Sequence, residues 1–237
     1  RISNYEIICI DDNSTDESFK IIKNFKRKYP NIKIIKNRKN IGVGASRNLG
    51  IKKAKGKYIV FLDSDDTIEN ESLNIILDFI KNKNTDLVSV NFKDFDNEEK
   101  NIFNSINKKS LFKYLSEYQS LNYCFPFIYN RYFIIKNNLF FDNFRYAEDF
   151  IFVTKVFCLM KKFEILNNLL INHKFNPRGL SSKSNLENDY VYLRGIRILD
   201  DFFYRKKISV EKQKYIFLRK KNLFFNFMLR TLKYELD

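Results

Sequence analysis

The feature that most constrains the fold is an apolar run that breaks off into acids. Residues 58–62 form a β-branched and aromatic stretch of strand length, and Asp63, Asp65 and Asp66 follow it at once. Such a run is typical of a buried parallel strand, and open α/β sheets bind ligands beyond the carboxyl ends of these strands. Three carboxylates this close together repel one another unless a cation or several hydrogen-bond donors lie among them. The run therefore predicts either a site for a hard divalent ion, Mg²⁺ or Mn²⁺, or a solvated turn that caps the next helix.

The same arrangement occurs earlier in the chain. The apolar residues 5–10 lead into Asp11 and Asp12, and a helical pattern follows, with Ser14 and Glu17 spaced as a capping box. Later strand-like and helical patterns alternate, with strands at 32–35 and 87–92 and helices that start near 45 and 73. This alternation predicts an α/β fold with a mostly parallel sheet and crossover helices.

Charge and cysteine content narrow the class of protein. The 237 residues carry a formal net charge of +15, which indicates an anionic partner: nucleic acid, an acidic membrane surface or phosphorylated substrates. Cys9, Cys124 and Cys158 lie far apart in apolar runs, so we expect reduced packing residues and a reducing, cytoplasmic location. No stretch approaches the roughly 18 apolar residues of a transmembrane helix.

Three tracts in order resemble the successive motifs of the family 2 glycosyltransferases, which are nucleotide-sugar enzymes with the GT-A fold. They are residues 8–16 (ICIDDNSTD), 40–48 (NIGVGASRN) and 61–66 (FLDSDD). The resemblance implies a GT-A-like, mostly parallel sheet with flanking helices: a Rossmann-like nucleotide-binding half, an acceptor-side region and C-terminal helices. Family members usually open with a strand and a helix before the first tract, so we expect this chain to lack that first strand and helix.

Glu148 and Asp149 precede the apolar run 150–157. Two acids are favoured at a helix start by the helix dipole alone, which is one interpretation. In the resemblance this pair is the acceptor-side motif, and Asp149 is the general base. The only histidine, His173, lies in a stretch that resembles the family segment facing the diphosphate, although a lone histidine is more often a surface residue.

The resemblance also assigns the remaining roles. Asp12 would accept the imide N–H of uracil and Arg47 would lie near the base and ribose, with Asp11, Asp63 and Asp65 beside them. The expected ligands of the Mn²⁺ or Mg²⁺ ion are Asp65, Asp63, Asp66 and His173. The implied reaction is inverting transfer of a sugar from a nucleoside diphosphate donor, with UDP expected, to a hydroxyl of a glycan or lipid-linked acceptor in surface polysaccharide synthesis.

The resemblance implies a nucleotide-sugar half (1–95) and an acceptor-side half (96–182), and the apolar and basic pattern of residues 183–237 predicts C-terminal basic amphipathic helices. The last region predicts contact with an anionic membrane surface on the inner face of the cell membrane, or packing against the sheet. Two alternatives stay open: a basic nucleic-acid- or polyanion-binding module, and an inactive truncated relative. Nucleic acid is not the expected partner, because a nucleic-acid groove would not gather Asp63, Asp65 and Asp66 at a strand end.

Overall fold

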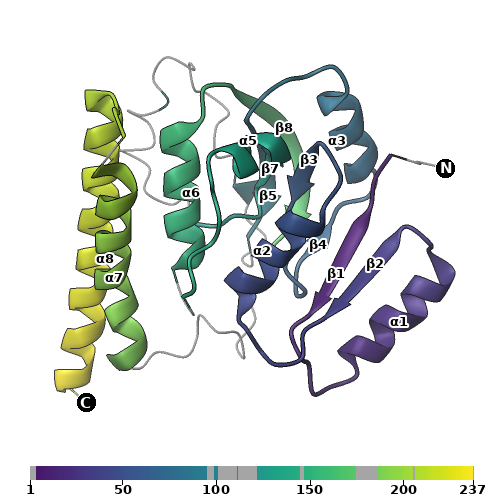
Figure 1. Cartoon of the computed structure of the whole chain (residues 1–237), viewed down its shortest axis with the longest axis horizontal. Helices are drawn as coiled ribbons and strands as arrows, with labels where there is room; N and C mark the ends of the chain where they lie inside the picture. The colour runs from purple at the N-terminus through teal and green to yellow at the C-terminus, as the bar shows by residue number, and fades with distance from the viewer. Residues whose placement is uncertain are drawn as a thin grey trace.

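The computed structural model describes residues 4–94, 99–100, 111, 122–144, 147–174, 186–204 and 206–236 (Figure 1). Most of residues 95–121, and residues 175–185, lie outside this description. Within them the chain forms two sheets flanked by helices, which confirms the predicted α/β class.

The smaller sheet is a parallel pair, β1 (Ile7–Asp11) and β2 (Ile32–Lys36). The larger sheet has the strand order β3-β7-β5-β8-β4, with β6 paired to β5 off this path. Its strands are β3 (Tyr58–Val60), β4 (Thr67–Ile68), β5 (Leu87–Lys93), β6 (Glu99–Lys100), β7 (Phe127–Asn130) and β8 (Phe163–Asn172). The strands β7 and β8, from residues 96–182, therefore share one sheet with β3, β4 and β5 of the first 95 residues.

The prediction of a mostly parallel sheet is wrong for the described residues. Only β1 with β2 and β5 with β8 pair in parallel, whereas β3 with β7, β5 with β7, β4 with β8 and β5 with β6 are antiparallel. The strand β7 lies between β3 and β5 and runs opposite to both. Apolar strand patterns show which residues form strands, but they do not show which strand becomes the neighbour.

The helices are α1 (Ser18–Lys28), α2 (Val43–Lys53), α3 (Ser72–Ile80), α5 (Arg131–Lys136), α6 (Glu148–Leu159), α7 (Leu186–Tyr204) and α8 (Val210–Leu236). The predicted capping box before α1 does not form, because α1 begins at Ser18, whose N–H donates to Oδ1 of Asp16 at 2.9 Å. Ser14 instead donates its N–H to Oδ1 of Asp11 at 3.2 Å, which turns the chain between β1 and α1.

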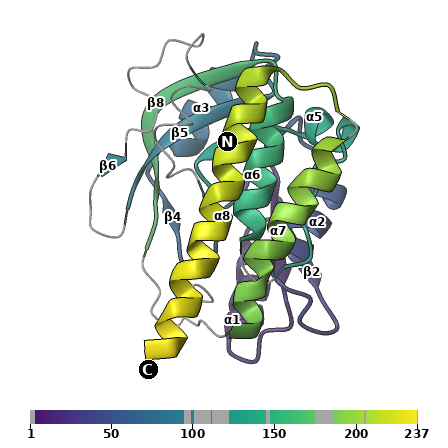
Figure 2. The ribbon, with the colours of Figure 1, turned by 90° about the vertical axis from the view of Figure 1, so that its left-hand side faces the viewer.

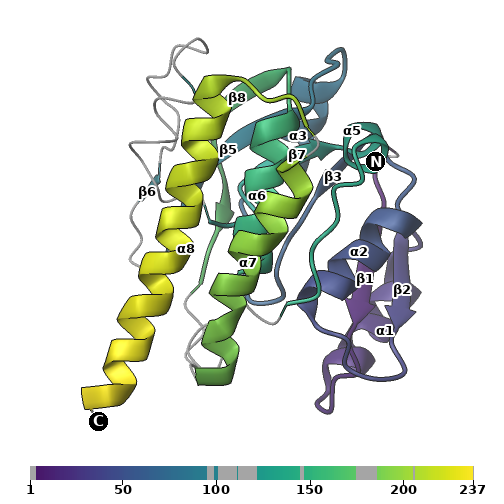
Figure 3. The ribbon, with the colours of Figure 1, turned by 60° about the vertical axis from the view of Figure 1, so that its left-hand side comes forward.

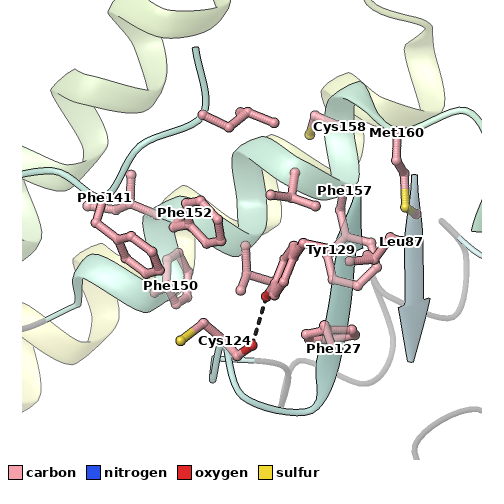
Figure 4. Close-up of a cluster of buried hydrophobic side chains, with 14 of the residues drawn as sticks. Leu87, Cys124, Phe127, Tyr129, Phe141, Phe150, Phe152, Phe157, Cys158 and Met160 are labelled. Carbon is pink, nitrogen blue, oxygen red and sulfur yellow. Dashed lines mark hydrogen bonds between the residues drawn. The ribbon is translucent and has the colours of Figure 1, made fainter. Parts of the chain in front are cut away.

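Hydrophobic side chains cover both faces of the larger sheet. Along β7, Phe127 and Tyr129 pack on the α6 side, whereas Ile128 packs on the α3 side with Val88 and Leu170. Figure 4 shows Phe127 and Tyr129 next to Phe152 and Phe157 of α6. The helix α6 is buried over almost its whole length, as its apolar sequence requires.

The helices α7 and α8 pack against each other and against α6, and they form the outer layer on that side (Figures 2 and 3). Cys124 and Cys158 are free and buried, as expected of packing residues, and Cys9 is partly exposed. In the part of the chain that the structure describes, no helix is long and apolar enough to cross a membrane.

Candidate active site

Arg47 of α2 lies at the centre of a group of carboxylates. Its Nη2 is 2.7 Å from Oδ1 of Asp63, and its Nη1 is 3.1 Å from Oε1 of Glu148 and also contacts Oδ1 of Asp149. Only 10% of the Arg47 side chain is exposed. Two of the three tracts, residues 40–48 and 61–66, and the Glu148–Asp149 pair therefore meet at one guanidinium group.

The start of α2 is held close to the start of α6. Asn48 donates its Nδ2 to the carbonyl of Phe141 at 2.7 Å and accepts the N–H of Phe141 at 2.8 Å. A Cβ atom at Gly44 would lie 3.3 Å from Cγ of Glu148, so the first turn of α2 has room for glycine but little more. Ala147, just before Glu148, has a φ of 60°, a left-handed conformation that is unfavourable for alanine and that directs the chain into α6.

Burial sets the protonation of the two acids at the start of α6. Burial and then the charge of Asp149 raise the pKa of Glu148, Arg47 opposes both effects, and the pKa lies at about 7 as the net result. Burial also raises the pKa of Asp149, whereas Arg47 and the N–H of Cys124 lower it. Burial thus keeps the pKa of both acids above its usual value, and Glu148 can exchange a proton near neutral pH.

Two residues that support Asp149 were not identified from the sequence as parts of the site. The backbone N–H of Cys124 donates to Oδ2 of Asp149 at 3.0 Å, and the hydroxyl of Tyr129 donates to the carbonyl of Cys124 at 2.9 Å (Figure 4). Both contacts use the backbone of Cys124, so no residue type signals them. The sequence indicated only that Cys124 is buried.

The acids that follow β3 do not share one set of partners. Asp63 turns to Arg47, whereas the buried Asp66 accepts hydrogen bonds at Oδ1 from Nδ1 of His173 at 2.9 Å and from the N–H of Lys174 at 3.1 Å. Asp65 is partly exposed. The four predicted metal ligands thus do not form a closed set, and among the described residues no three histidine, cysteine, aspartate or glutamate side chains are grouped to hold a metal ion.

His173 is the partner of Asp66. The hydrogen bond to Asp66 raises the pKa of His173, burial opposes this, and the charges of Asp66, Asp94 and Asp63 raise it further. Its ring stacks on Phe125 with the ring centres 4.8 Å apart. The ring is thus oriented by Asp66 and Phe125, and the role of His173 as a metal ligand or a diphosphate contact stays a prediction.

Asp12 holds the loop between β2 and α2. Its Oδ1 accepts from Nδ2 of Asn37 at 2.8 Å and from the N–H of Ile41 at 2.9 Å, and its Oδ2 accepts the N–H of Gly42 at 2.8 Å. Nδ2 of Asn37 also lies 3.1 Å from Oγ of Ser46, the neighbour of Arg47. The end of β1 is therefore connected by hydrogen bonds to the helix that carries Arg47.

Asp11 and Arg47 differ from their expected surroundings. Asp11 is 2% exposed, and its Oδ2 lies 3.8 Å from Nζ of Lys36. Arg47, expected near the base and ribose, binds carboxylates here. The nucleotide contacts of Asp11, Asp12, Arg47, Asp63 and Asp65 stay predictions.

The fold is shared with solved structures of S. aureus TarS. The crystal structure of S. aureus TarS 1-349 in complex with UDP matches with a TM-score of 0.70 at 21% identity, over 90% of this chain and 60% of that chain. A second crystal structure of the same protein, in complex with UDP-GlcNAc, has a TM-score of 0.67 at 20% identity, over 94% of this chain and 72% of that chain. The expected GT-A-like fold is confirmed.

The sequence is also similar to curated proteins that are named as sugar transferases. The poly(ribitol-phosphate) beta-glucosyltransferase of Bacillus spizizenii is 49% identical over 84 residues, 35% of this chain and 13% of that protein. The cholesterol galactosyltransferase of Borreliella burgdorferi is 30% identical over 196 residues, 76% of this chain and 54% of that protein. The chain thus spans about half or less of the length of these curated relatives. The family model described as glycosyl transferase family 2 matches residues 1–144, more than half of the chain, and the chain belongs to this family.

Proposed function

We propose that this chain carries the catalytic centre of an inverting, metal-dependent glycosyltransferase. It would transfer a sugar from a UDP-sugar to a hydroxyl of a glycan or lipid-linked acceptor in surface polysaccharide synthesis. The observation that carries this proposal is the buried Glu148–Asp149 pair, held beside Asp63 by Arg47. UDP as the nucleotide is supported by the bound UDP of the TarS structure and by the partly exposed carboxylates after β3.

Asp149 would act as the general base. As the acceptor hydroxyl attacks the anomeric carbon, its proton passes to the Asp149 carboxylate while the bond to UDP breaks on the opposite face of the sugar, which inverts the configuration. Arg47 favours the ionised form of Asp149 that this step needs, because it lowers the pKa of that carboxyl. His173, oriented by its hydrogen bond to Asp66, would contact the diphosphate.

The acids after β3 fit a divalent ion that is completed by substrate. Mg²⁺ and Mn²⁺ are commonly held by one or two carboxylates together with substrate phosphates. Asp65 and Asp63 are partly exposed, and Oδ2 of the buried Asp66 has no hydrogen-bond partner. Asp65, with Asp63 or Asp66, would hold Mn²⁺ or Mg²⁺, which would supply charge neutralisation for the departing UDP.

The test compares Asp149→Asn with Asp200→Asn, a change at an exposed carboxylate on α7 that pairs with Lys220. We expect Asp149→Asn to abolish UDP release from UDP-GlcNAc while UDP affinity, measured by calorimetry with Mn²⁺, stays within roughly twofold. Asp200→Asn should retain both properties. Full activity of Asp149→Asn would refute the base assignment, and full activity in the presence of a chelator would refute the metal.

We also propose that α8 contacts an anionic membrane surface on the cytoplasmic side. Among the described residues, its exposed apolar side chains include Phe217, Phe224, Phe225, Met228 and Leu229, each at least 40% exposed. Lys214 and Lys221 on the same helix are also exposed, and the whole chain carries +15. Apolar side chains with flanking lysines suit the interface of an anionic bilayer.

Co-sedimentation with vesicles tests this contact. The wild type should sediment with vesicles that contain phosphatidylglycerol and not with pure phosphatidylcholine vesicles. The double change of Phe224 and Phe225 to serine should weaken sedimentation, whereas Phe25→Ser, at a 53% exposed position on α1, should not. Equal loss in both variants, or binding to neither vesicle by the wild type, would refute the membrane contact.

A further inference from the structure

Arg219 is a buried arginine on α8, outside the segment that matches the family model. The residue is only 2% exposed. Its Nε donates to Oγ1 of Thr154 at 3.0 Å, its Nη1 donates to Oδ1 of Asn122 at 2.9 Å, and its Nη2 lies 3.4 Å from the carbonyl of Phe150. The guanidinium carbon lies 3.4 Å from the centre of the Phe150 ring. One side chain of α8 thus reaches both α6 and the segment before β7.

These two segments are the ones that orient Asp149. Phe150 follows Asp149 directly, and Asn122 lies two residues before Cys124, whose N–H donates to Oδ2 of Asp149 at 3.0 Å. Arg219 therefore binds both segments joined by that hydrogen bond. A relative shift of either segment would lengthen the contact between Cys124 and the carboxylate.

Anchoring of α8 alone does not account for a buried arginine. Tyr215 and Leu223, one turn before and one turn after Arg219, are 1% and 0% exposed and already fix α8 in the core. Burial disfavours the guanidinium charge, and it lowers the pKa of Arg219. An apolar side chain would pack α8 without that desolvation cost, so the polar contacts indicate a role in geometry.

We propose that Arg219 is a positioning residue for sugar transfer, which joins Asn122 to the start of α6 and so keeps the Asp149 carboxylate aimed at the acceptor hydroxyl. This inference rests on the proposed role of Asp149 as the base. It gives the C-terminal helix a part in the chemistry, without contact between Arg219 and the substrate.

The experiment uses Arg219→Met, Arg219→Lys and Asn122→Ala, with Lys220→Met as the matched control. Lys220, the next residue on α8, pairs with Asp200 of α7 at 2.6 Å. We expect Arg219→Met to reduce kcat for UDP release from UDP-GlcNAc by roughly 10- to 100-fold while the KM stays within twofold. Arg219→Lys should recover part of kcat, Asn122→Ala should lose less than Arg219→Met, and Lys220→Met should match the wild type.

A second measurement needs no turnover. The amide proton of Cys124, followed in ¹⁵N-labelled protein by NMR, reports its hydrogen bond to Asp149, and its resonance should move upfield in Arg219→Met and Asn122→Ala but not in Lys220→Met. If the wild type releases no UDP, the proposed function fails, while this resonance still tests the positioning role. A wild-type kcat together with an unshifted Cys124 resonance in Arg219→Met would overturn the inference. Should that variant not fold, the same pair of results in Asn122→Ala, at an exposed position, would overturn it.

Discussion

Replacing Arg47 by methionine tests the electrostatic reasoning most directly. The change keeps a side chain of similar length but leaves Asp63, Glu148 and Asp149 without the guanidinium that binds all three. Removing one partner of a buried ion pair costs about 3–5 kcal/mol. In a domain of this size each kcal/mol lowers the Tm by about 2–4 °C, so we expect a decrease of roughly 6–20 °C at pH 8.

The pH dependence of this loss identifies its cause. Glu148 and Asp149 have a raised pKa in the folded protein, and without Arg47 their pKa rises further. An acid whose pKa is raised on folding destabilises the fold as the pH rises through the unfolded and then the folded pKa, so the penalty disappears in acid. The difference in Tm between Arg47→Met and the wild type should therefore shrink between pH 8 and pH 4.

Thermal unfolding across this pH range is the assay, with Arg27→Met as the control. Arg27 lies exposed on α1, and its replacement should change stability by no more than about 0.5 kcal/mol at any pH. A Tm for Arg47→Met equal to that of the wild type at pH 8 would refute the reasoning. A decrease of the same size at pH 4 and pH 8 would show that lost packing, and not unpaired charge, is the cause.

Three further changes test individual contacts by urea unfolding. Glu148→Gln should stabilise the fold by about 1–3 kcal/mol at pH 8 and should not change its stability at pH 4. The reason is that the pKa of Glu148 is raised from 4.5 to about 7, so its ionised form is disfavoured in the folded protein. A less stable variant at pH 8 would contradict this. Asp12→Asn should cost about 1–3 kcal/mol, since an amide NH₂ would face the N–H donors of Asn37, Ile41 or Gly42, and unchanged stability would show that these bonds contribute little. Gly44→Ala should cost about 1–3 kcal/mol, because its Cβ would lie 3.2 Å from the carbonyl of Asp142, and a neutral result would mean that the start of α6 can yield.

Much of the site could be predicted from local patterns. An apolar strand that ends in acids places those acids at a sheet edge, which holds for Asp63 after β3 and for Asp12 after β1. Acids at a helix start are equally local, and α6 does begin at Glu148. These features depend on residues that are neighbours in the sequence, so the local sequence pattern is enough to predict them.

The partners of these acids could not be predicted. Arg47 was expected beside a nucleotide, yet it lies 2.7 Å from Asp63 and contacts Asp149, which is 102 positions along the chain. Asp65, Asp66 and His173 were expected around one ion, and the structure joins Asp66 and His173 by a direct hydrogen bond. A long side chain such as that of Arg47 can reach several acids, and the packing of α2 against the start of α6 determines which of them it contacts.

The amino-acid sequence by itself determined the alternation of strands and helices in the first 95 residues, the acidic turns and the membership in a family, because each depends on short-range periodicity or on a contiguous motif. The tertiary structure decided which strands pair, how burial raises the pKa of Glu148 and Asp149, and how Arg219 of α8 reaches the segments beside Asp149. These are effects of desolvation and of contacts between distant segments, and they arise only in the folded chain.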